Sequence, residues 1–332
     1  MIVVDADVLG RNRTGEETYV LNLLRQLPLV APDLSFGAVT RHPELLPEGI
    51  EPLPLAAGSQ ELRMAWTLPR LLRRLRPELA HFQHALPLGY RGRSVVTLHD
   101  LHFERDPGVM GLADRVTFRF FVPRAAKRAD HVLSVSERTK HDAVELYGID
   151  PDRVTVTPHG VDPAFAPGGA RRGFLLFVGA IQARKDPLAA AVAAAGVGLP
   201  LVAVGPEREP QLARELRAQG VDVRGWVEQD DLAELYRGAE ALILPSRYEG
   251  FGVPVLEAMA SGTPVVCSRD AALREVAGDA AAYDEDGDFA GAVRRVLADR
   301  ERYVRAGLER VKAFSWEETA RRTAAVYRGV LG

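Results

Sequence analysis

Two glutamates with seven residues between them, Glu249 and Glu257, flank a glycine-rich stretch that has the chemistry to bind a phosphorylated sugar. The stretch follows an apolar run of strand length at residues 240–245 and places Pro254 at a first helical position. The amino end of such a helix favours anions, because its backbone N–H groups and its dipole point at the ligand. Glu249 in the loop and Glu257 about one turn into the helix should therefore address different parts of one elongated ligand, rather than act as a paired acid and base.

The turn between the two glutamates supplies candidate anion donors. The backbone N–H groups of Phe251, Gly252 and Val253 are expected to point at a diphosphate or at sugar hydroxyls. Glycines at positions such as Gly250 and Gly252 let a ligand approach the backbone closely. The helix is expected to end before Gly262, ahead of the next buried strand. The result is a βαβ unit with its ligand crevice at the carboxyl ends of the strands.

Two adjacent cations, Arg184 and Lys185, follow another apolar strand at residues 174–178. Arg184 can hold a phosphate through two parallel hydrogen bonds and Lys185 can act as a mobile point charge, so the pair could neutralise a leaving diphosphate without a metal ion. Gly179 ends the strand and begins the loop that carries them. The alternative is a pair that is simply solvated on a surface loop, and the position after a strand favours phosphate binding.

The string Glu-Gly-Phe-Gly-x-Pro-x-x-Glu-Ala-Met-Ala-x-Gly-x-Pro-Val-Val over residues 249–266 resembles the signature of the retaining family 4 (group 1) glycosyltransferases. The resemblance implies the GT-B fold, an α/β architecture of two facing Rossmann-like domains with a cleft between them. It implies that Glu249 contacts the donor sugar near the reaction centre and that Glu257 holds the ribose hydroxyls of the nucleotide. Arg184 and Lys185 resemble the family's phosphate-binding segment in its mannosyltransferase-like form. The alternative is that Glu257 faces solvent and that Glu249 only stabilises the turn.

The amino-terminal half also resembles the family. A strand at residues 95–98 delivers His99, which the resemblance places beside the transferred sugar, where we expect it to hydrogen-bond rather than to act as a general base. The alternative is a hydrogen-bonded histidine at a strand end. Gly15 lies in a loop that approaches the donor phosphates and the acceptor in the family. Relatives often carry a second glycine shortly after the first, whereas this chain has Glu16 and Glu17.

The resemblance spans nearly the whole chain and sets the expected domains. We expect an amino-terminal Rossmann-like, acceptor-binding domain at residues 1–162 and a proline- and glycine-containing linker at residues 163–172. A carboxyl-terminal Rossmann-like domain that binds the nucleotide sugar should occupy residues 173–314, and a helix at residues 315–332 should cross back to the first domain. A length of 332 residues and a hydrophobic fraction of 47% are sufficient for two cores.

Local signals add two helix starts and one structural residue. Thr14 with Glu17 predicts a capping box, and Ser136 is expected to cap the helix that follows it. His159 precedes Gly160 near the end of the first domain, and we interpret this histidine as structural.

Composition excludes several other classes of protein. The net charge of −3 gives no footprint of nucleic-acid binding, and the single cysteine, Cys267, excludes both a disulfide framework and a thiolate metal site. The chain shows neither an uninterrupted apolar span of membrane length nor a signal peptide, which predicts a cytoplasmic protein.

Three basic, amphipathic segments qualify that prediction. Residues 63–66, 71–76 and 119–128 all lie in the half expected to bind the acceptor, and together they could rest on anionic lipid at the inner face of a membrane. The alternative, which the pattern favours, is solvated helix faces with apolar sides turned to the core.

The resemblance implies metal-independent transfer of a hexosyl group, without a cofactor, from a nucleotide diphosphate sugar to an acceptor hydroxyl in glycan, polysaccharide or glycolipid biosynthesis. It implies that the anomeric configuration is retained, and the mannosyltransferase-like form of the Arg-Lys pair leans towards GDP-mannose over a UDP-sugar as the donor. The departing phosphate oxygen could take the acceptor proton on the same face of the sugar, or Glu249 could form a covalent glycosyl-enzyme, and both routes remain open.

Two other functional classes remain. A nucleotide-sugar epimerase of the same fold would bind a similar ligand, but such enzymes lack the glutamate string. A non-catalytic nucleotide-sugar-binding subunit is the second, and the altered loop after Gly15 is the hint for it. The intact Glu249, Glu257, Arg184 and Lys185 argue against it.

Overall fold

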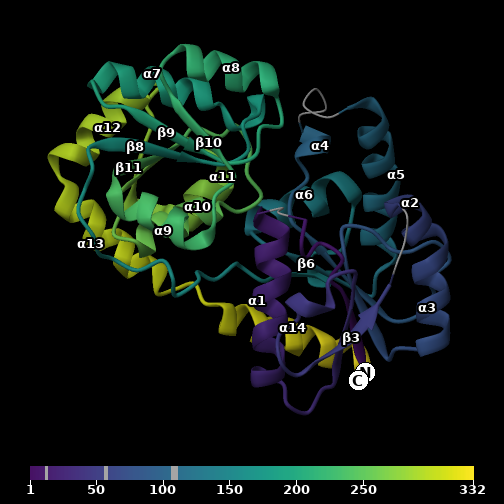
Figure 1. Cartoon of the computed structure of the whole chain (residues 1–332). Coiled ribbons are helices and arrows are strands. Elements are labelled where there is room, and N and C mark those ends of the chain that lie inside the picture. Colours follow the sequence, from purple (N-terminus) through teal and green to yellow (C-terminus); the bar gives the residue numbers. More distant parts are fainter. Residues whose placement is uncertain (12–13, 56–58, 106–110) are drawn as a thin grey trace. The chain divides into compact units, whose positions relative to one another are not determined.

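The computed structural model of the chain describes residues 1–11, 14–55, 59–105 and 111–332 (Figure 1). The chain divides into two compact units. Unit 1 comprises Met1–Gly160 together with Ser315–Gly332, and unit 2 comprises Val161–Phe314. In the described part of each unit every strand pairing is parallel, as alternating strands and helices predict. Two Rossmann-like domains of the α/β class are therefore confirmed.

Unit 1 contains a seven-stranded sheet in the order β3-β2-β1-β4-β5-β6-β7. Its elements are β1 Ile2–Asp5, α1 Thr14–Val30, β2 Phe36–Thr40, β3 Ile50–Pro54, α2 Gln60–Leu62, a π-helical turn Arg63–Thr67, α3 Leu68–Leu75, β4 Leu79–Gln83, β5 Ser94–Leu98, α4 His102–Arg105, α5 Leu112–Arg128, β6 His131–Ser134, α6 Glu137–Tyr147, β7 Val154–Val156 and α14 Trp316–Leu331. The chain order reverses between β1 and β4, so the two loops after these strands open at one point of the carboxyl edge.

Unit 2 contains a six-stranded sheet in the order β10-β9-β8-β11-β12-β13. Its elements are β8 Phe174–Val178, α7 Pro187–Val197, β9 Leu201–Val204, α8 Pro210–Ala218, β10 Asp222–Gly225, α9 Gln229–Gly238, β11 Ala239–Leu244, α10 Val253–Ala260, β12 Val265–Cys267, α11 Ala271–Ala277, β13 Ala281–Tyr283, α12 Phe289–Ala298 and α13 Arg300–Val311. Here the order reverses between β8 and β11, and the loops after these two strands carry the cations and Glu249.

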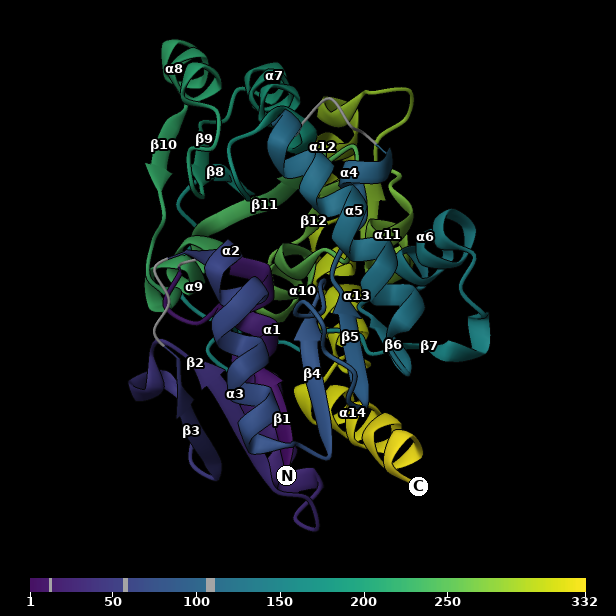
Figure 2. The same cartoon turned by 90° about the vertical axis from the view of Figure 1, so that its right-hand side faces the viewer.

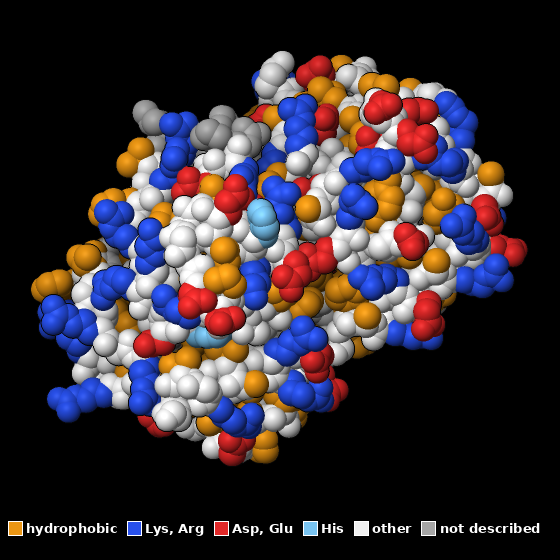
Figure 3. Space-filling view, turned by 180° about the vertical axis from the view of Figure 1, so that it is seen from behind, with side chains coloured by type: hydrophobic (Ala, Val, Ile, Leu, Met, Phe, Trp, Pro, Cys, Tyr) orange, Lys and Arg blue, Asp and Glu red, His pale blue; other side chains and the backbone are white. Residues whose placement is uncertain are grey.

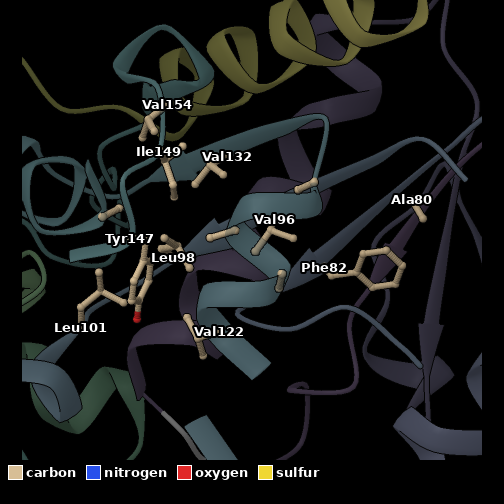
Figure 4. Close-up of a cluster of buried hydrophobic side chains, with 14 of the residues drawn as sticks. Ala80, Phe82, Val96, Leu98, Leu101, Val122, Val132, Tyr147, Ile149 and Val154 are labelled. Carbon is tan, nitrogen blue, oxygen red and sulfur yellow. The ribbon is translucent and has the colours of Figure 1, made fainter. Parts of the chain in front are cut away.

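Buried apolar strands hold the sheets in place. All five residues of β8 are buried, as are the four residues of β1, which is the pattern of strands covered on both faces. Figure 4 shows part of the hydrophobic core of unit 1, a cluster that includes Val96 of β5, Val132 of β6 and Val122 of α5.

The carboxyl-terminal helix belongs to unit 1. Helix α14 lies against α1, β4 and β6 (Figure 2). It begins after Ser315, whose side chain accepts a hydrogen bond from the backbone N–H of Glu318. Its start needs glycine at position 160, because a Cβ there would lie 2.2 Å from the backbone nitrogen of Trp316. The hydroxyl of Tyr327 also lies 2.6 Å from Nδ1 of His81 inside the unit.

The boundary between the units differs from the prediction. The first segment of unit 1 ends at Gly160, and residues 163–172, expected to be the interdomain linker, cluster with unit 2. Phe165 is buried there against Tyr236, and Arg171 forms an ion pair with Glu240 at 2.9 Å. An apolar contact and a charge pair therefore fix a segment that its prolines and glycines marked only as irregular.

Two helix starts were predicted from local signals. The hydroxyl of Ser136 accepts a hydrogen bond from the backbone N–H of Thr139 at 3.0 Å, which confirms this cap. The Glu17 carboxylate accepts from the N–H of Gly10 at 2.6 Å. The side chain of Thr14 lies outside the described residues, so the capping box stays a prediction. In the described part of the chain, every helix is too short or too polar to cross a bilayer.

Candidate functional site at the carboxyl edge of the sheets

Helix α10 begins and ends as the sequence predicts, with Pro254 in its first turn. The turn before it requires glycine at position 252, because φ is +111° and a Cβ would lie 2.7 Å from Cδ2 of Leu273. Gly262 follows the helix with φ +72° and allows the chain to leave it. The amino end of α10 therefore lies at the carboxyl edge of the sheet, directly after Gly250, Phe251 and Gly252.

Arg184 and Lys185 lie beside Glu249, although 64 positions separate Lys185 from it in the chain. The neighbouring positions of β8 and β11 bring their two loops together. The Nζ atom of Lys185 lies 2.5 Å and 2.6 Å from the two carboxylate oxygens of Glu249. The nearest guanidinium nitrogen of Arg184 is 4.0 Å from Oε2. The three charges thus form one cluster.

The Glu249 carboxylate is buried but charged. Burial alone would raise its pKa, but the charge of Lys185 and then that of Arg184 outweigh it and hold the pKa below its ordinary value. Glu249 is therefore ionised at neutral pH, with both of its oxygens directed at an ammonium group. Such a carboxylate can stabilise positive charge that develops on a neighbouring group.

Arg184 joins the two loops. Its Nη1 donates to the backbone oxygen of Tyr248 at 2.6 Å, and its own backbone oxygen accepts from the N–H of Arg247 at 2.9 Å. The side chain is buried, yet its Nε has no hydrogen-bond partner within the described residues. A buried N–H group without a partner is uncommon, and it leaves one donor of the guanidinium for a ligand.

The Glu257 carboxylate has a different environment from that of Glu249. Its Oε2 accepts a hydrogen bond from the hydroxyl of Tyr236 on α9 at 2.8 Å. Burial raises the pKa of Glu257 to about 7, the hydrogen bond from Tyr236 opposes this, and the charge of Asp162 adds to it. A buried carboxyl group whose pKa is raised to about 7 is typical of a functional position rather than of a solvated helix face.

In unit 1, His99 follows β5 and is buried. One of its ring nitrogens, Nε2, lies 2.8 Å from Oε1 of Gln83, and its ring packs edge-on against Tyr19. Burial lowers the pKa of His99 to about 4, so the imidazole is neutral at physiological pH. If Nε2–H donates to Gln83, the remaining nitrogen is a hydrogen-bond acceptor.

The two predicted glycines outside the α10 turn have different surroundings. A Cβ on Gly15 would have no atom of the described residues within 4 Å, so this position borders open space in the part of the chain that the structure describes. A Cβ on Gly179 would lie 3.8 Å from Cδ of Lys185, which places Gly179 next to the charge cluster.

The structure therefore gathers most of the predicted residues at the carboxyl edge of the second sheet: Gly179, Arg184, Lys185, Glu249, Gly250, Phe251, Gly252, Val253 and Glu257. Gly15 and His99 lie in unit 1. Sequence reasoning missed Tyr236, which had no signal beyond an apolar helix position. It also missed the contact of Glu16 with His84, for which the departure of the loop after Gly15 was the available signal.

Two family descriptions match the chain. Residues 13–165 match the family described as Glycosyltransferase Family 4, and residues 172–299 match the one described as Glycosyl transferases group 1. Together they include every described strand of both sheets except β1.

Two curated proteins and one solved structure are also similar to this chain. The chain is 28% identical to O-antigen chain mannosyltransferase B of Escherichia coli over 71% of its own length and 70% of that protein. It is 34% identical to D-inositol 3-phosphate glycosyltransferase of Kribbella flavida, over 62% of its own length but only 58% of that protein. The solved structure of sucrose-phosphate synthase from Thermosynechococcus elongatus superposes with a TM-score of 0.78 at 20% identity, covering 99% of this chain and 98% of that one. Identity at that level shows the shared fold.

Proposed function

The chain belongs to the family 4 glycosyltransferases, and from this premise we propose that it transfers a hexose from a nucleotide diphosphate sugar to an acceptor hydroxyl with retention of configuration. The observation that carries the proposal is the cluster of Lys185, Arg184 and Glu249 beside the amino end of α10. Two cations and a helix amino end suit a diphosphate, and a buried carboxylate suits the sugar attached to it.

The donor would lie along the carboxyl edge of the second sheet. Its diphosphate would meet Arg184, Lys185 and the turn that precedes α10, and these groups would supply the positive charge without a metal ion. The Nε of Arg184 offers a donor for this contact. The Glu257 carboxylate would accept hydrogen bonds from the ribose hydroxyls. The mannosyltransferase among the relatives supports mannose, and therefore GDP-mannose, as the donor to test first.

In the reaction, the bond from the anomeric carbon to the phosphate oxygen breaks and a bond to the acceptor oxygen forms on the same face. The proton of the acceptor hydroxyl passes to the departing phosphate oxygen. Glu249 would stabilise the oxocarbenium-like sugar, and His99, neutral at physiological pH, would hydrogen-bond to a hydroxyl of that sugar. The pairing of both Glu249 oxygens with Lys185 favours this route over a covalent glycosyl-enzyme, because an ammonium contact weakens a carboxylate nucleophile.

The test begins with thermal stabilisation by UDP, GDP, ADP and dTDP, each with and without EDTA. We expect a shift with one diphosphate that EDTA does not remove, followed by transfer from the matching nucleotide sugar. Glu249→Gln should lower turnover at least about 100-fold while nucleotide affinity changes little. Unchanged turnover in this variant would refute the role of Glu249. A sugar isomer released without any acceptor would instead identify an epimerase, and binding without any reaction would identify a non-catalytic subunit.

We also propose that unit 1 rests on anionic lipid at the inner face of the membrane. Trp66, Val116 and Phe120 are 54%, 61% and 48% exposed, and α3 and α5, which pack on the same hydrophobic cluster, both carry exposed arginines. The guanidinium of Arg70 lies 5.0 Å from the ring centroid of Trp66. Figure 3 shows one face of the molecule, on which hydrophobic and basic side chains are interleaved.

One predicted member of this basic surface is in fact buried. Arg63 is 2% exposed and forms ion pairs with Asp5 and Asp7. The lipid-facing set is therefore restricted to exposed residues such as Arg70, Arg73 and Arg124. Flotation with vesicles that contain phosphatidylglycerol should recover the protein, and Trp66→Ser with Phe120→Ser should reduce recovery. Equal recovery with neutral vesicles, or none with anionic ones, would overturn this proposal.

A further inference from the structure

A second pair of ionisable groups lies at the point where the strand order of the first sheet reverses. Glu16 is in the first turn of α1, which follows β1, and His84 directly follows β4. Oε1 of Glu16 lies 3.1 Å from Nε2 of His84. In open parallel sheets the crevice beyond the carboxyl ends at such a reversal is where ligands bind. Glu16 and His84 therefore lie at the reversal of strand order in unit 1, just as Lys185 and Glu249 lie at the reversal in unit 2.

The backbone of His84 is held in an unusual conformation. Its φ is +59°, in the left-handed region that few residues other than glycine adopt. Its backbone N–H donates to the oxygen of Thr97 on β5 at 3.0 Å, which fixes the turn. Strain of this kind at the end of a strand is a feature of ligand sites, because it aims one side chain in one direction.

The imidazole of His84 is only half satisfied. The residue is 9% exposed, and its Nδ1 is buried without a hydrogen-bond partner among the described residues. Because Nε2 faces the Glu16 carboxylate, this nitrogen carries the hydrogen of the bond, and Nδ1 remains for another group. A buried polar nitrogen without a partner costs free energy, which a hydroxyl placed there would offset.

The charges around His84 determine what kind of ligand fits. Its ring lies 5.2 Å from that of His99 and 6.3 Å from that of Phe118, and the carboxylates of Glu16 and Asp100 both act on its titration. Burial lowers the pKa of His84, but the bond and charge of Glu16 and the charge of Asp100 raise it more. Two carboxylates disfavour a phosphate or carboxylate group at Nδ1, so a neutral hydroxyl suits the position better.

The loop beside the pair borders open space. Glu16 directly follows Gly15 in the first turn of α1. A Cβ on Gly15 would meet nothing within 4 Å among the described residues. A glycine at position 16 would have no side chain to hold the imidazole, so the contact depends on the residue that this chain carries there.

Resting on the proposed glycosyl transfer, we propose that His84 binds a hydroxyl of a neutral sugar acceptor through Nδ1 and that Glu16 is a positioning residue that holds the imidazole for this contact. Loss of one hydrogen bond to the acceptor corresponds to about a tenfold fall in kcat/KM for that acceptor. KM for the acceptor should carry most of the change, because the contact exists before transfer.

The test uses the full chain with the donor identified by thermal shift and with methyl α-mannoside and methyl α-glucoside as probe acceptors. His84→Asn is the main variant, because asparagine tolerates a left-handed backbone. We expect its acceptor KM to rise about tenfold while the donor KM and the stabilisation by nucleotide remain as in the wild type. His141→Asn, which changes a histidine that is 72% exposed on α6, is the matched control and should behave as the wild type.

Glu16→Gln tests the positioning role. It keeps a hydrogen-bond acceptor but removes the charge that raises the pKa of His84, so the acid limb of kcat/KM for the acceptor should move to lower pH. The charge of Asp100 remains in this variant, and the neutral ring of His99 still lies beside His84. An unmoved pH profile together with an unchanged acceptor KM in both variants would overturn the proposal, as would an equal rise of the donor KM. A wild-type protein that binds nucleotide and hydrolyses donor but transfers to neither probe would overturn it too, whereas absence of any reaction with donor would be a failure of the proposed function itself.

Discussion

Replacing Glu257 by glutamine should make unit 2 more stable at pH 8 and should weaken nucleotide binding at the same time. The carboxyl group has a pKa raised to about 7 from an ordinary value of 4.5, mainly by burial. The folded protein therefore holds this proton more tightly than the unfolded chain does. The contribution of Glu257 to stability is fully present below pH 4.5 and is lost as the pH rises from 4.5 through about 7, which is the opposite of the usual behaviour of a carboxylate.

The magnitude follows from the two pKa values. At about 1.4 kcal/mol per pH unit, ionising Glu257 in the folded state costs about 3 kcal/mol above pH 7. A glutamine avoids this cost and keeps an oxygen for the hydroxyl of Tyr236. Glu257→Gln should thus raise the free energy of unfolding by up to about 3 kcal/mol at pH 8 and by little at pH 4.5.

Urea denaturation at both pH values, with the wild type as reference, measures the effect. Glu215→Gln on the exposed surface of α8 is the control and should show no such dependence on pH. The functional side is measured by nucleotide titration, where loss of a charge-assisted contact with ribose should weaken binding about 10- to 100-fold. A variant less stable than the wild type at pH 8 would refute the account of burial, and unchanged nucleotide affinity would refute the ribose contact.

Two further predictions concern the packing of each unit. Lys185→Met should destabilise unit 2 by about 3–5 kcal/mol at pH 8 because it leaves the buried charge of Glu249 without its nearest partner, and the loss should shrink as the pH falls through the range where Glu249 can take up a proton. The double variant with Glu249→Gln should recover most of that loss, and strictly additive effects in a double-mutant cycle would contradict a direct pair. Gly160→Ala should destabilise unit 1 by about 1–3 kcal/mol or more, because the new Cβ meets the backbone of Trp316 at 2.2 Å. In the same unit, the Cβ added by Gly329→Ala on α14 would meet no atom of the described residues within 4 Å, so this variant should raise the free energy of unfolding by about 0.5–1 kcal/mol. Thermal denaturation that ranks the two variants alike would contradict the steric argument.

Elements formed by local signals were predictable. The apolar run 174–178 is β8 to the residue, and the strand before Glu249 is displaced by only one position from residues 240–245. The turn and helix that follow also lie where glycine and proline placed them, since the positive φ of Gly252 and of Gly262 is a local conformation that favours glycine.

Charge partners were not predictable in the same way. The basic segment at residues 63–66 looked like part of a solvated or lipid-facing surface, yet Arg63 is buried against Asp5 and Asp7. Hydropathy and spacing indicate on which face of its own helix or strand a residue lies. They do not indicate which residue at the end of a distant strand will pair with it.

By itself, the sequence determined the family, the α/β class and the identity of most donor-site candidates, because each depends on residue types within short stretches of chain. Only the tertiary structure decided which residues pair. Lys185 donates hydrogen bonds to both oxygens of Glu249. The hydroxyl of Tyr236 donates to Glu257, and the carboxylate of Glu16 pairs with His84. The physical reason is the order of the strands. In each parallel sheet the order of the strands reverses, between β1 and β4 in unit 1 and between β8 and β11 in unit 2. At each reversal, loops that lie far apart along the chain come side by side.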